Sequence, residues 1–241
     1  MNINPIPVEV IFFDAAGTLF HVRGSVGEIY STIARKYGVA SQPAEVQEAF
    51  VEAFRAKSTE GISPHASAGR EQEERCWWMD VVRRAFSGRI PESVLPAYFE
   101  EVFDVFRGPG GWELYSDTRA TLHRLQSNGY RLGVLSNFDS RLIDVLANLG
   151  IGEFFESVVF SWCAGFAKPD TRIFHHALHV MRVPAKSALH VGDSIEEDYR
   201  GASRAGIQAL LLDRGNECPD ADGILRITCL SELCGLLPES G

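Results

Sequence analysis

Four short polar stretches combine residue types that could attack, hold or neutralise an anionic group. A carboxylate can act as a nucleophile, a hydroxyl and an ammonium group can hold a transferring group, and clustered carboxylates are the ligands that Mg²⁺ prefers. A single aspartate before a helix is most often its N-cap, but four such stretches in one chain favour an active site. They are DAAGT (14–18), SN (136–137), KP (168–169) and GDSIEED (192–198).

These stretches lie at or just past the ends of apolar runs that are rich in Val, Ile and Leu. The runs predict five strands, at 8–14, 130–137, 155–161, 187–194 and 207–213. Between the later strands, apolar residues recur three or four positions apart, as in amphipathic helices. This alternation predicts an α/β fold, a Rossmann-like, doubly wound parallel sheet, in which ligands bind at the carboxyl edge.

Residues 22–112 depart from this alternation, because they contain several helical periodicities and no convincing strand. We therefore expect an all-helical domain inserted after the first strand, and a core domain made of residues 1–21 and 113–241. The stretch 107–117 is rich in glycine and contains a proline, which makes it the expected hinge where the insertion returns to the sheet.

Composition limits the classes of partner. The formal net charge is -9, which disfavours general binding to nucleic acid or to an anionic membrane. The five cysteines include no Cys-x-x-Cys pair, so neither a disulfide framework nor a zinc ribbon is indicated. The apolar stretch near the N-terminus is too short for a signal peptide or a membrane span. We expect a cytoplasmic protein, monomeric or homodimeric, that acts on a small molecule.

The four stretches resemble the motifs of the haloacid dehalogenase superfamily, in the same order. DAAGTL is similar to the first motif, Asp-x-Asp-Gly-Thr-Leu, LSN to the second, KPD to the third and GDSIEED to the acidic fourth. The stretches SNFDSRL, KPDTRIF and VRGSVGEIY are also similar to one branch of the superfamily. The resemblance implies a hydrolase whose helical insertion is a cap over the Rossmann-like core.

The resemblance also implies a role for each matched residue. Asp14 would be the nucleophile that forms a covalent aspartyl intermediate, and Ser136 and Lys168 would hold the transferring group. The substrate-binding residues would be Gly17, Thr18, Asn137 and, just past the first motif, Arg23. The cofactor would be Mg²⁺, bound by Asp14, the backbone carbonyl of Ala16, Asp193 and Asp198.

Ala16 departs from the first motif, which has a second aspartate at this position. In superfamily members that hydrolyse phosphate monoesters, that aspartate protonates the leaving group and later deprotonates the attacking water. Alanine keeps the backbone carbonyl but cannot exchange protons. Since general acid/base catalysis contributes about 10² to 10⁴ in rate, we expect hydrolysis of small phosphorylated metabolites with stable leaving groups, such as acyl or aryl phosphates.

Three alternatives remain open. Enzymes that dehalogenate 2-haloacids also lack an aspartate at this position, although they work without metal and this chain keeps the acidic GDSIEED. Phosphonoacetaldehyde hydrolases have alanine there and use a Schiff-base lysine from the insertion, for which Lys36 and Lys57 are the candidates. A catalytically weak or silent protein that binds a phosphorylated ligand is the third, and the retained Asp14 argues against it.

Overall fold

The computed structural model describes residues 8–59, 70–217 and 223–237. Contacts divide the chain into two compact units. The sheet unit comprises residues 1–21, 114–139 and 149–241, and the helical unit comprises residues 22–113 and 140–148. The segment 140–148, which follows the second predicted strand, thus groups with the helical unit and not with the sheet.

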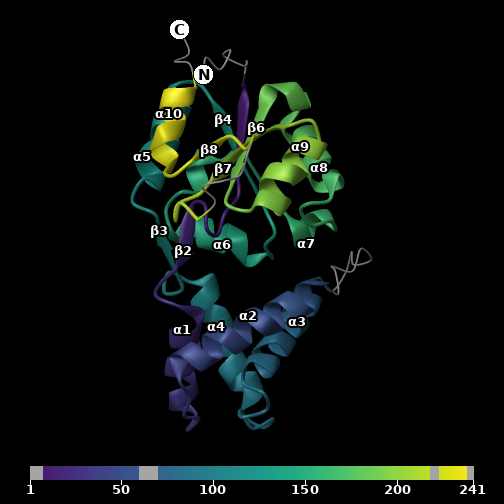
Figure 1. Ribbon diagram of the computed structural model, residues 1–241. Coiled ribbons are helices and arrows are strands. Elements are labelled where there is room, and N and C mark those ends of the chain that lie inside the picture. Colours follow the sequence, from purple (N-terminus) through teal and green to yellow (C-terminus); the bar gives the residue numbers. More distant parts are fainter. Residues whose placement is uncertain (1–7, 60–69, 218–222, 238–241) are drawn as a thin grey trace. The chain divides into compact units, whose positions relative to one another are not determined.

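The sheet unit contains six strands in the order β5-β4-β1-β6-β7-β8, and all neighbours pair in parallel (Figure 1). Five of the strands are those predicted from the sequence: β1 (Val10–Phe13), β4 (Arg131–Ser136), β5 (Ser157–Phe160), β6 (Ala188–Gly192) and β7 (Gln208–Leu212). The sixth, β8 (Arg226–Ile227), was not predicted, because two residues carry no periodicity.

Helices cover both faces of this sheet, as a doubly wound fold requires (Figure 1). On one face, α8 (Thr171–Met181) and α9 (Gly201–Arg204) pack on a core that includes Val10, Phe12 and Leu135. The other face carries α5 (Thr118–Ser127) and α10 (Leu233–Leu236). Val10 to Phe13 are fully buried, as expected for a central strand between two helical layers.

Shorter elements complete the sheet unit. A 3₁₀ turn, η1 (Gly152–Phe154), precedes β5, and α7 (Ser161–Ala164) follows it. Two further 3₁₀ turns are η2 (Ala185–Ser187) and η4 (Leu230–Glu232). The acidic stretch after β6 forms a single π-helical segment, η3 (Ile195–Arg200), which continues into α9. The last four residues of GDSIEED therefore lie on a helix that follows β6, as the alternation of strands and helices predicts.

The helical unit is built from α1 (Val26–Lys36), α2 (Pro43–Thr59), α3 (Arg70–Ala85), α4 (Leu95–Arg107) and α6 (Arg141–Asn148). Ser25 caps α1 through a reciprocal capping box with Glu28. Aromatic rings fill the centre of the unit, where Tyr30 contacts Tyr98, Phe86 and Phe106. The buried Tyr98 hydroxyl donates to the Tyr30 carbonyl at 3.0 Å, which satisfies the polar end of that ring.

Two short strands that the sequence did not indicate, β2 (Phe20–Val22) and β3 (Trp112–Leu114), pair where the chain passes between the units. The sequence predicted a loop hinge over 107–117, and β3 lies within it. Strands of three residues are too short to show alternation, and these two lie about 90 residues apart. The hinge is therefore a paired ribbon.

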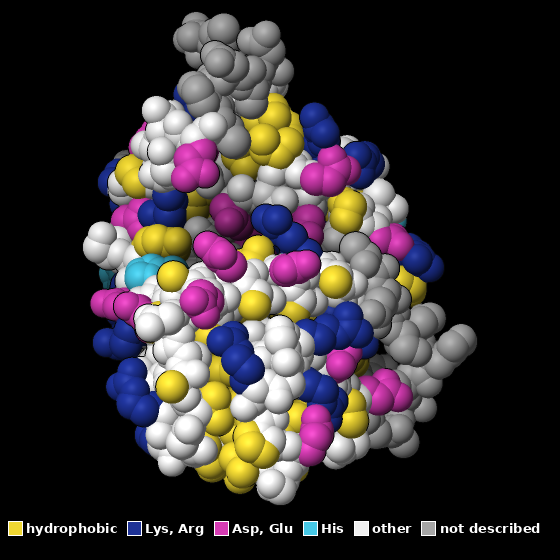
Figure 2. Space-filling view, turned by 60° about the horizontal axis from the view of Figure 1, so that its bottom comes forward, with side chains coloured by type: hydrophobic (Ala, Val, Ile, Leu, Met, Phe, Trp, Pro, Cys, Tyr) yellow, Lys and Arg dark blue, Asp and Glu magenta, His cyan; other side chains and the backbone are white. Residues whose placement is uncertain are grey.

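The described residues contain no helix that combines the length and the apolar character needed to span a membrane. On the face shown in Figure 2, lysine and arginine side chains alternate with aspartate and glutamate side chains over the described residues. The described residues on that face form no continuous basic surface.

Candidate active site

Three adjacent strands deliver the first polar residues of the site. Asp14 directly follows β1, Ser136 ends β4, and Asp193 directly follows β6. Because β1 lies between β4 and β6 in register, these residues reach the same carboxyl edge. The Asp14 amide donates to the Val191 carbonyl at 2.9 Å, which extends the ladder to the start of the turn.

Asp14 and Lys168 form a buried ion pair. Lys168 Nζ lies 2.7 Å from Asp14 Oδ1, and the same oxygen accepts a hydrogen bond from Ser136 Oγ at 2.9 Å. Asp14 is 6% exposed and Lys168 only 3%. Within the described residues, Asp14 Oδ2 accepts no hydrogen bond. One carboxylate oxygen is therefore fixed, and the other stays available to a ligand.

Lys168 also pairs with Asp198, whose Oδ1 lies 2.5 Å from Nζ. Burial opposes the charge of Lys168, but the two carboxylates outweigh it and raise the pKa of the ammonium above its usual range. Burial likewise disfavours the Asp198 carboxylate, yet Lys168 and His190 outweigh it and hold its pKa well below the usual value. The pair is therefore ionised at neutral pH.

The pKa values of Asp14 and Asp193 are raised, whereas that of Asp198 is lowered. Burial is the main cause that raises the pKa of Asp14, with Lys168 opposing it and Asp198 adding repulsion. The Asp193 side chain is partly open to solvent, but desolvation of its carboxylate together with repulsion from Asp14 and Asp198 raises its pKa to about 7. Three carboxylates thus share a single lysine, and the surplus negative charge would be relieved by a cation.

The turn of the first motif is shaped around Asp193. Gly17 has φ +93°, in the left-handed region that favours glycine, and a Cβ at this position would lie 2.3 Å from Asp193 Oδ2. A side chain at residue 17 would therefore displace the Asp193 carboxylate. In this structure, Gly17 makes room for the acidic group.

The donor set fits a hard divalent cation. One oxygen each from Asp14, Asp193 and Asp198 lies within 4.8 Å of the others. Asp198 is largely engaged, because Oδ1 accepts from Lys168 and His190 and Oδ2 accepts from the Ser194 amide. Asp14 Oδ2 and the Asp193 carboxylate are less committed. Among the described residues, no hydrogen bond reaches the Ala16 carbonyl, which leaves it available as a ligand too.

Asn137 links two loops of the site. Its Nδ2 donates to the Lys168 carbonyl at 2.9 Å and to Glu197 Oε2 at 3.0 Å, and its Oδ1 accepts from the Lys168 amide at 2.7 Å. Both ends of the Asn137 amide are therefore used within the protein. The contacts show Asn137 holding the backbone that carries Lys168, and substrate binding by this residue stays a prediction.

Thr18 and Arg23 have different surroundings. Thr18 is fully buried, its hydroxyl has no partner among the described residues, and its carbonyl accepts from Arg214 at 2.9 Å. Arg214 also makes a two-point ion pair with Asp117. Arg23 belongs to the helical unit and is exposed, with its amide donating to the Gly111 carbonyl. Substrate contacts of Thr18 and Arg23 likewise stay predictions.

Two residues of this cluster were missed by the sequence reasoning. His190 lies inside the predicted strand SALHVGDS, where a lone histidine among apolar residues was the available signal. Glu197 stands in the acidic run GDSIEED, where acidic residues are common in the first turn of a helix, but it bonds to Asn137, and desolvation raises its pKa although Lys168 opposes this. A sequence cannot show which face of a one-turn segment such a glutamate occupies.

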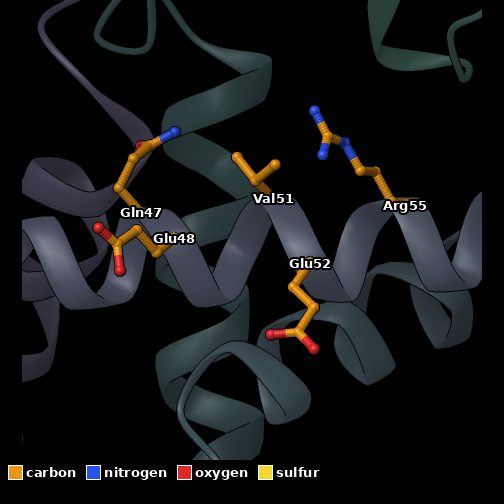
Figure 3. Close-up of a pocket in the computed structure, with 5 residues that line it drawn as sticks. All are labelled: Gln47, Glu48, Val51, Glu52 and Arg55. Atoms are coloured by element: carbon orange, nitrogen blue, oxygen red, sulfur yellow. The ribbon is translucent and has the colours of Figure 1, made fainter.

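A separate hollow lies in the helical unit, along α2 (Figure 3). Figure 3 shows Gln47, Val51 and Arg55 on one side of this helix, with Glu48 and Glu52 directed elsewhere. These side chains come from one helix and do not converge on one point, unlike the polar groups of a ligand site. This hollow is therefore a weaker candidate for a ligand site than the cluster of Asp14, Asp193 and Asp198 at the sheet edge.

Comparison with known proteins agrees with this geometry. The sequence model of haloacid dehalogenase-like hydrolases matches residues 8–206. Haloacid dehalogenase-like hydrolase domain-containing protein 3 from Bos taurus is 34% identical over 210 residues, which make up 86% of this chain and 82% of the relative. That protein represents the branch that SNFDSRL, KPDTRIF and VRGSVGEIY resemble.

Two further comparisons extend the range of relatives. A glyceraldehyde 3-phosphate phosphatase from Methanothermobacter thermautotrophicus is 42% identical over 100 residues, covering 41% of this chain and 44% of the phosphatase. The solved structure of a defluorinating L-2-haloacid dehalogenase has a TM-score of 0.77 at 17% identity, covers 95% of each chain and shares the fold. Because the family model spans residues 8–206 and the Bos taurus relative is similar over most of both chains, the chain belongs to the haloacid dehalogenase-like hydrolase family.

Proposed function

We propose that this hydrolase is an Mg²⁺-dependent phosphatase that uses Asp14 as its nucleophile and acts on small phosphorylated compounds with stable leaving groups. One observation carries the proposal: Asp14 Oδ1 is held by Ser136 and Lys168, while Oδ2 stays uncommitted beside a surplus of carboxylates. The phosphatase relative, matched over part of the chain, supports phosphate as the transferred group.

The reaction would take two displacements at phosphorus. Asp14 Oδ2 attacks the phosphorus atom, the bond from phosphorus to the leaving oxygen breaks, and the leaving group departs as an anion. Water then attacks the phosphorus of the aspartyl phosphate, which releases inorganic phosphate and restores the carboxylate. Lys168 Nζ and Ser136 Oγ, both within 3 Å of Asp14 Oδ1, would stabilise the charge of the transferring group.

Mg²⁺, when bound by Asp14, Asp193 and the Ala16 carbonyl, would neutralise charge on the phosphoryl oxygens and orient them. Asp198 would act mainly by holding Lys168, because its oxygens already accept three hydrogen bonds. The methyl group of Ala16 offers no proton. The leaving group must therefore depart without an acid, which favours acyl and aryl phosphates over alkyl phosphates.

The helical unit would act as the cap that selects the substrate, and Arg23 is its candidate contact. This assignment rests on the family, since caps of this kind exclude water and shape the pocket when they close. A cytoplasmic location and a monomeric or homodimeric state complete the proposal.

Dehalogenation of a 2-haloacid is the second candidate. It is favoured by Ala16, because a halide leaves as an anion and needs no proton. It is disfavoured by Asp193, because a third carboxylate that repels Asp14 and Asp198 has no use in an enzyme without metal and fits a cation site.

The other two alternatives have less support. Lys36 pairs with Glu101, and Lys57 lies 3.3 Å from Asp80, so both candidate Schiff-base lysines are engaged by carboxylates within the helical unit. A silent phospho-ligand binder would have no use for a nucleophile held by two donors, which argues against that alternative.

The test is a small substrate panel with and without Mg²⁺. Acetyl phosphate, an aryl phosphate, an alkyl phosphate and 2-chloropropionate are incubated with the wild type and with Asp14→Asn. We expect Mg²⁺-dependent turnover of the first two, abolished in the variant, and thermal stabilisation by beryllofluoride with Mg²⁺ that also requires Asp14. Phosphate release that persists in Asp14→Asn, or chloride release without metal, would reject the proposal.

A further inference from the structure

His190 lies in the middle of β6, where almost every neighbour is apolar. It is 1% exposed, between Leu189 and Val191, and its ring meets Phe174 edge to face at 5.4 Å. A polar ring at such a position loses its hydration on folding, and this loss is recovered only through hydrogen bonds. The partners of His190 therefore indicate why a histidine stands here.

The ring makes one hydrogen bond among the described residues. Nε2 lies 2.8 Å from Asp198 Oδ1, and Nδ1 is buried without a partner. Because the carboxylate can only accept, Nε2 must carry the proton. Because Nδ1 stays unpartnered, a histidine fills the core less well than an aliphatic residue would, and the hydrogen bond to Asp198 is what the histidine adds at this position.

The single hydrogen bond falls on the carboxylate that holds Lys168. Asp198 Oδ1 accepts from both His190 Nε2 and Lys168 Nζ, and Oδ2 accepts from the Ser194 amide at 3.0 Å. The carboxylate also lies against the strand itself, since a Cβ on Gly192 would be 2.2 Å from Asp198 Cγ. Residues 190 and 192 share one face of β6, so the His190 ring and Gly192 both contact Asp198 from that face of the strand.

From these contacts we infer that His190 is a positioning residue, which fixes Asp198 and through it the Lys168 ammonium beside the nucleophile. The order of contacts is His190 to Asp198, Asp198 to Lys168, and Lys168 to Asp14 Oδ1. Without the Nε2 donor, the carboxylate keeps Lys168 but can turn about its Cβ–Cγ bond, and Nζ follows it. This inference rests on the proposed function, because it assigns Lys168 a part in turnover.

Misplacement of a catalytic group by about 1 Å lowers turnover by roughly 100-fold. For His190→Leu we expect kcat on acetyl phosphate to fall roughly 10- to 100-fold with KM little changed, and the free energy of unfolding to fall because the buried Asp198 carboxylate loses a donor. In His190→Gln, the side-chain amide can donate from nearly the same place as Nε2. That variant should recover most of kcat.

Phe174→Leu is the matched control, because it removes the ring packed on His190 and leaves the hydrogen bond to Asp198 in place. It should lose stability and keep most of kcat. If the role of His190 were merely structural, kcat would fall together with stability in both His190→Leu and Phe174→Leu. Unchanged kcat in His190→Leu, or equal loss in the leucine and glutamine variants, would overturn the inference.

Histidine ¹⁵N spectra report the hydrogen bond without any turnover. We expect a slowly exchanging proton on His190 Nε2 in the wild type, lost in Asp198→Ala. A proton found only on Nδ1 would overturn the inference on its own. If the signal behaves as expected but none of the phosphates is hydrolysed, the proposed function fails while the contact between His190 and Asp198 stands.

Discussion

Replacement of Asp193 by asparagine should stabilise the metal-free protein, and increasingly so as the pH rises. The pKa of Asp193 is raised from 3.8 to about 7 by desolvation and by repulsion from Asp14 and Asp198. Between these two values the folded state binds a proton that the unfolded chain has lost. The contribution of Asp193 to stability is therefore full below about pH 4, falls across the window and is lost above about pH 7.

The size of the effect follows from the width of that window. Each pKa unit corresponds to about 1.36 kcal/mol, so three units set an upper bound on the order of 4 kcal/mol, but Asp193 is exposed and solvent screening reduces its contribution to roughly 1 to 2 kcal/mol. Asparagine resembles the protonated carboxyl and does not titrate. The variant should therefore match the wild type near pH 4 and exceed its free energy of unfolding by roughly 1 to 2 kcal/mol near pH 8.

The assay is urea unfolding in EDTA, followed by circular dichroism at about pH 5 and about pH 8, and repeated with excess Mg²⁺. A bound cation stabilises the charged form, so Mg²⁺ should stabilise the wild type more at pH 8 than at pH 5 and the variant hardly at all. Asp198 does not interfere, because its lowered pKa affects stability only below about pH 4. An equal difference between the two proteins at both pH values would refute the reasoning.

Three further substitutions test the site from other directions. Ala16→Asp should raise turnover of alkyl phosphates, by up to about 10² to 10⁴, because it adds the missing proton donor; a steady-state assay on glycerol phosphate checks this, and no gain would mean that the absent acid does not limit the enzyme. Gly17→Ala should weaken Mg²⁺ binding measured by calorimetry, since its Cβ would lie 2.3 Å from Asp193 Oδ2. Gly165→Ala is the control, because Gly165 has a similar positive φ but open space around it. That variant should lose only about 1 kcal/mol of stability through backbone strain and keep its Mg²⁺ affinity. Lys168→Met should abolish turnover and lower the free energy of unfolding by about 3 to 5 kcal/mol, because Asp14 and Asp198 lose their shared counter-ion; denaturant unfolding at neutral pH checks this, and wild-type stability there would contradict the buried pair.

Much of the sheet could be predicted from local pattern. A central parallel strand is buried on both faces, so it reads as a continuous apolar run, as Val10 to Phe13 do. The polar residues that end these runs then meet at one edge, because parallel strands point the same way. The short strands β2, β3 and β8 escaped, because their two or three residues are defined by pairing partners far along the chain.

For the candidate site, too, the sequence indicated some features and only the structure showed others. Residue types and their order indicated Asp14, Ser136, Lys168, Asp193 and Asp198 and drew attention to Ala16, because the proposed chemistry depends on which functional groups are present. Only the tertiary structure decided how those groups are used. It placed Asp198 on Lys168, turned Asn137 toward the backbone, brought Glu197 into the cluster and set His190 beneath it. Hydrogen bonds form between atoms that are close in space, and for residues up to 154 positions apart only the folded chain sets that distance.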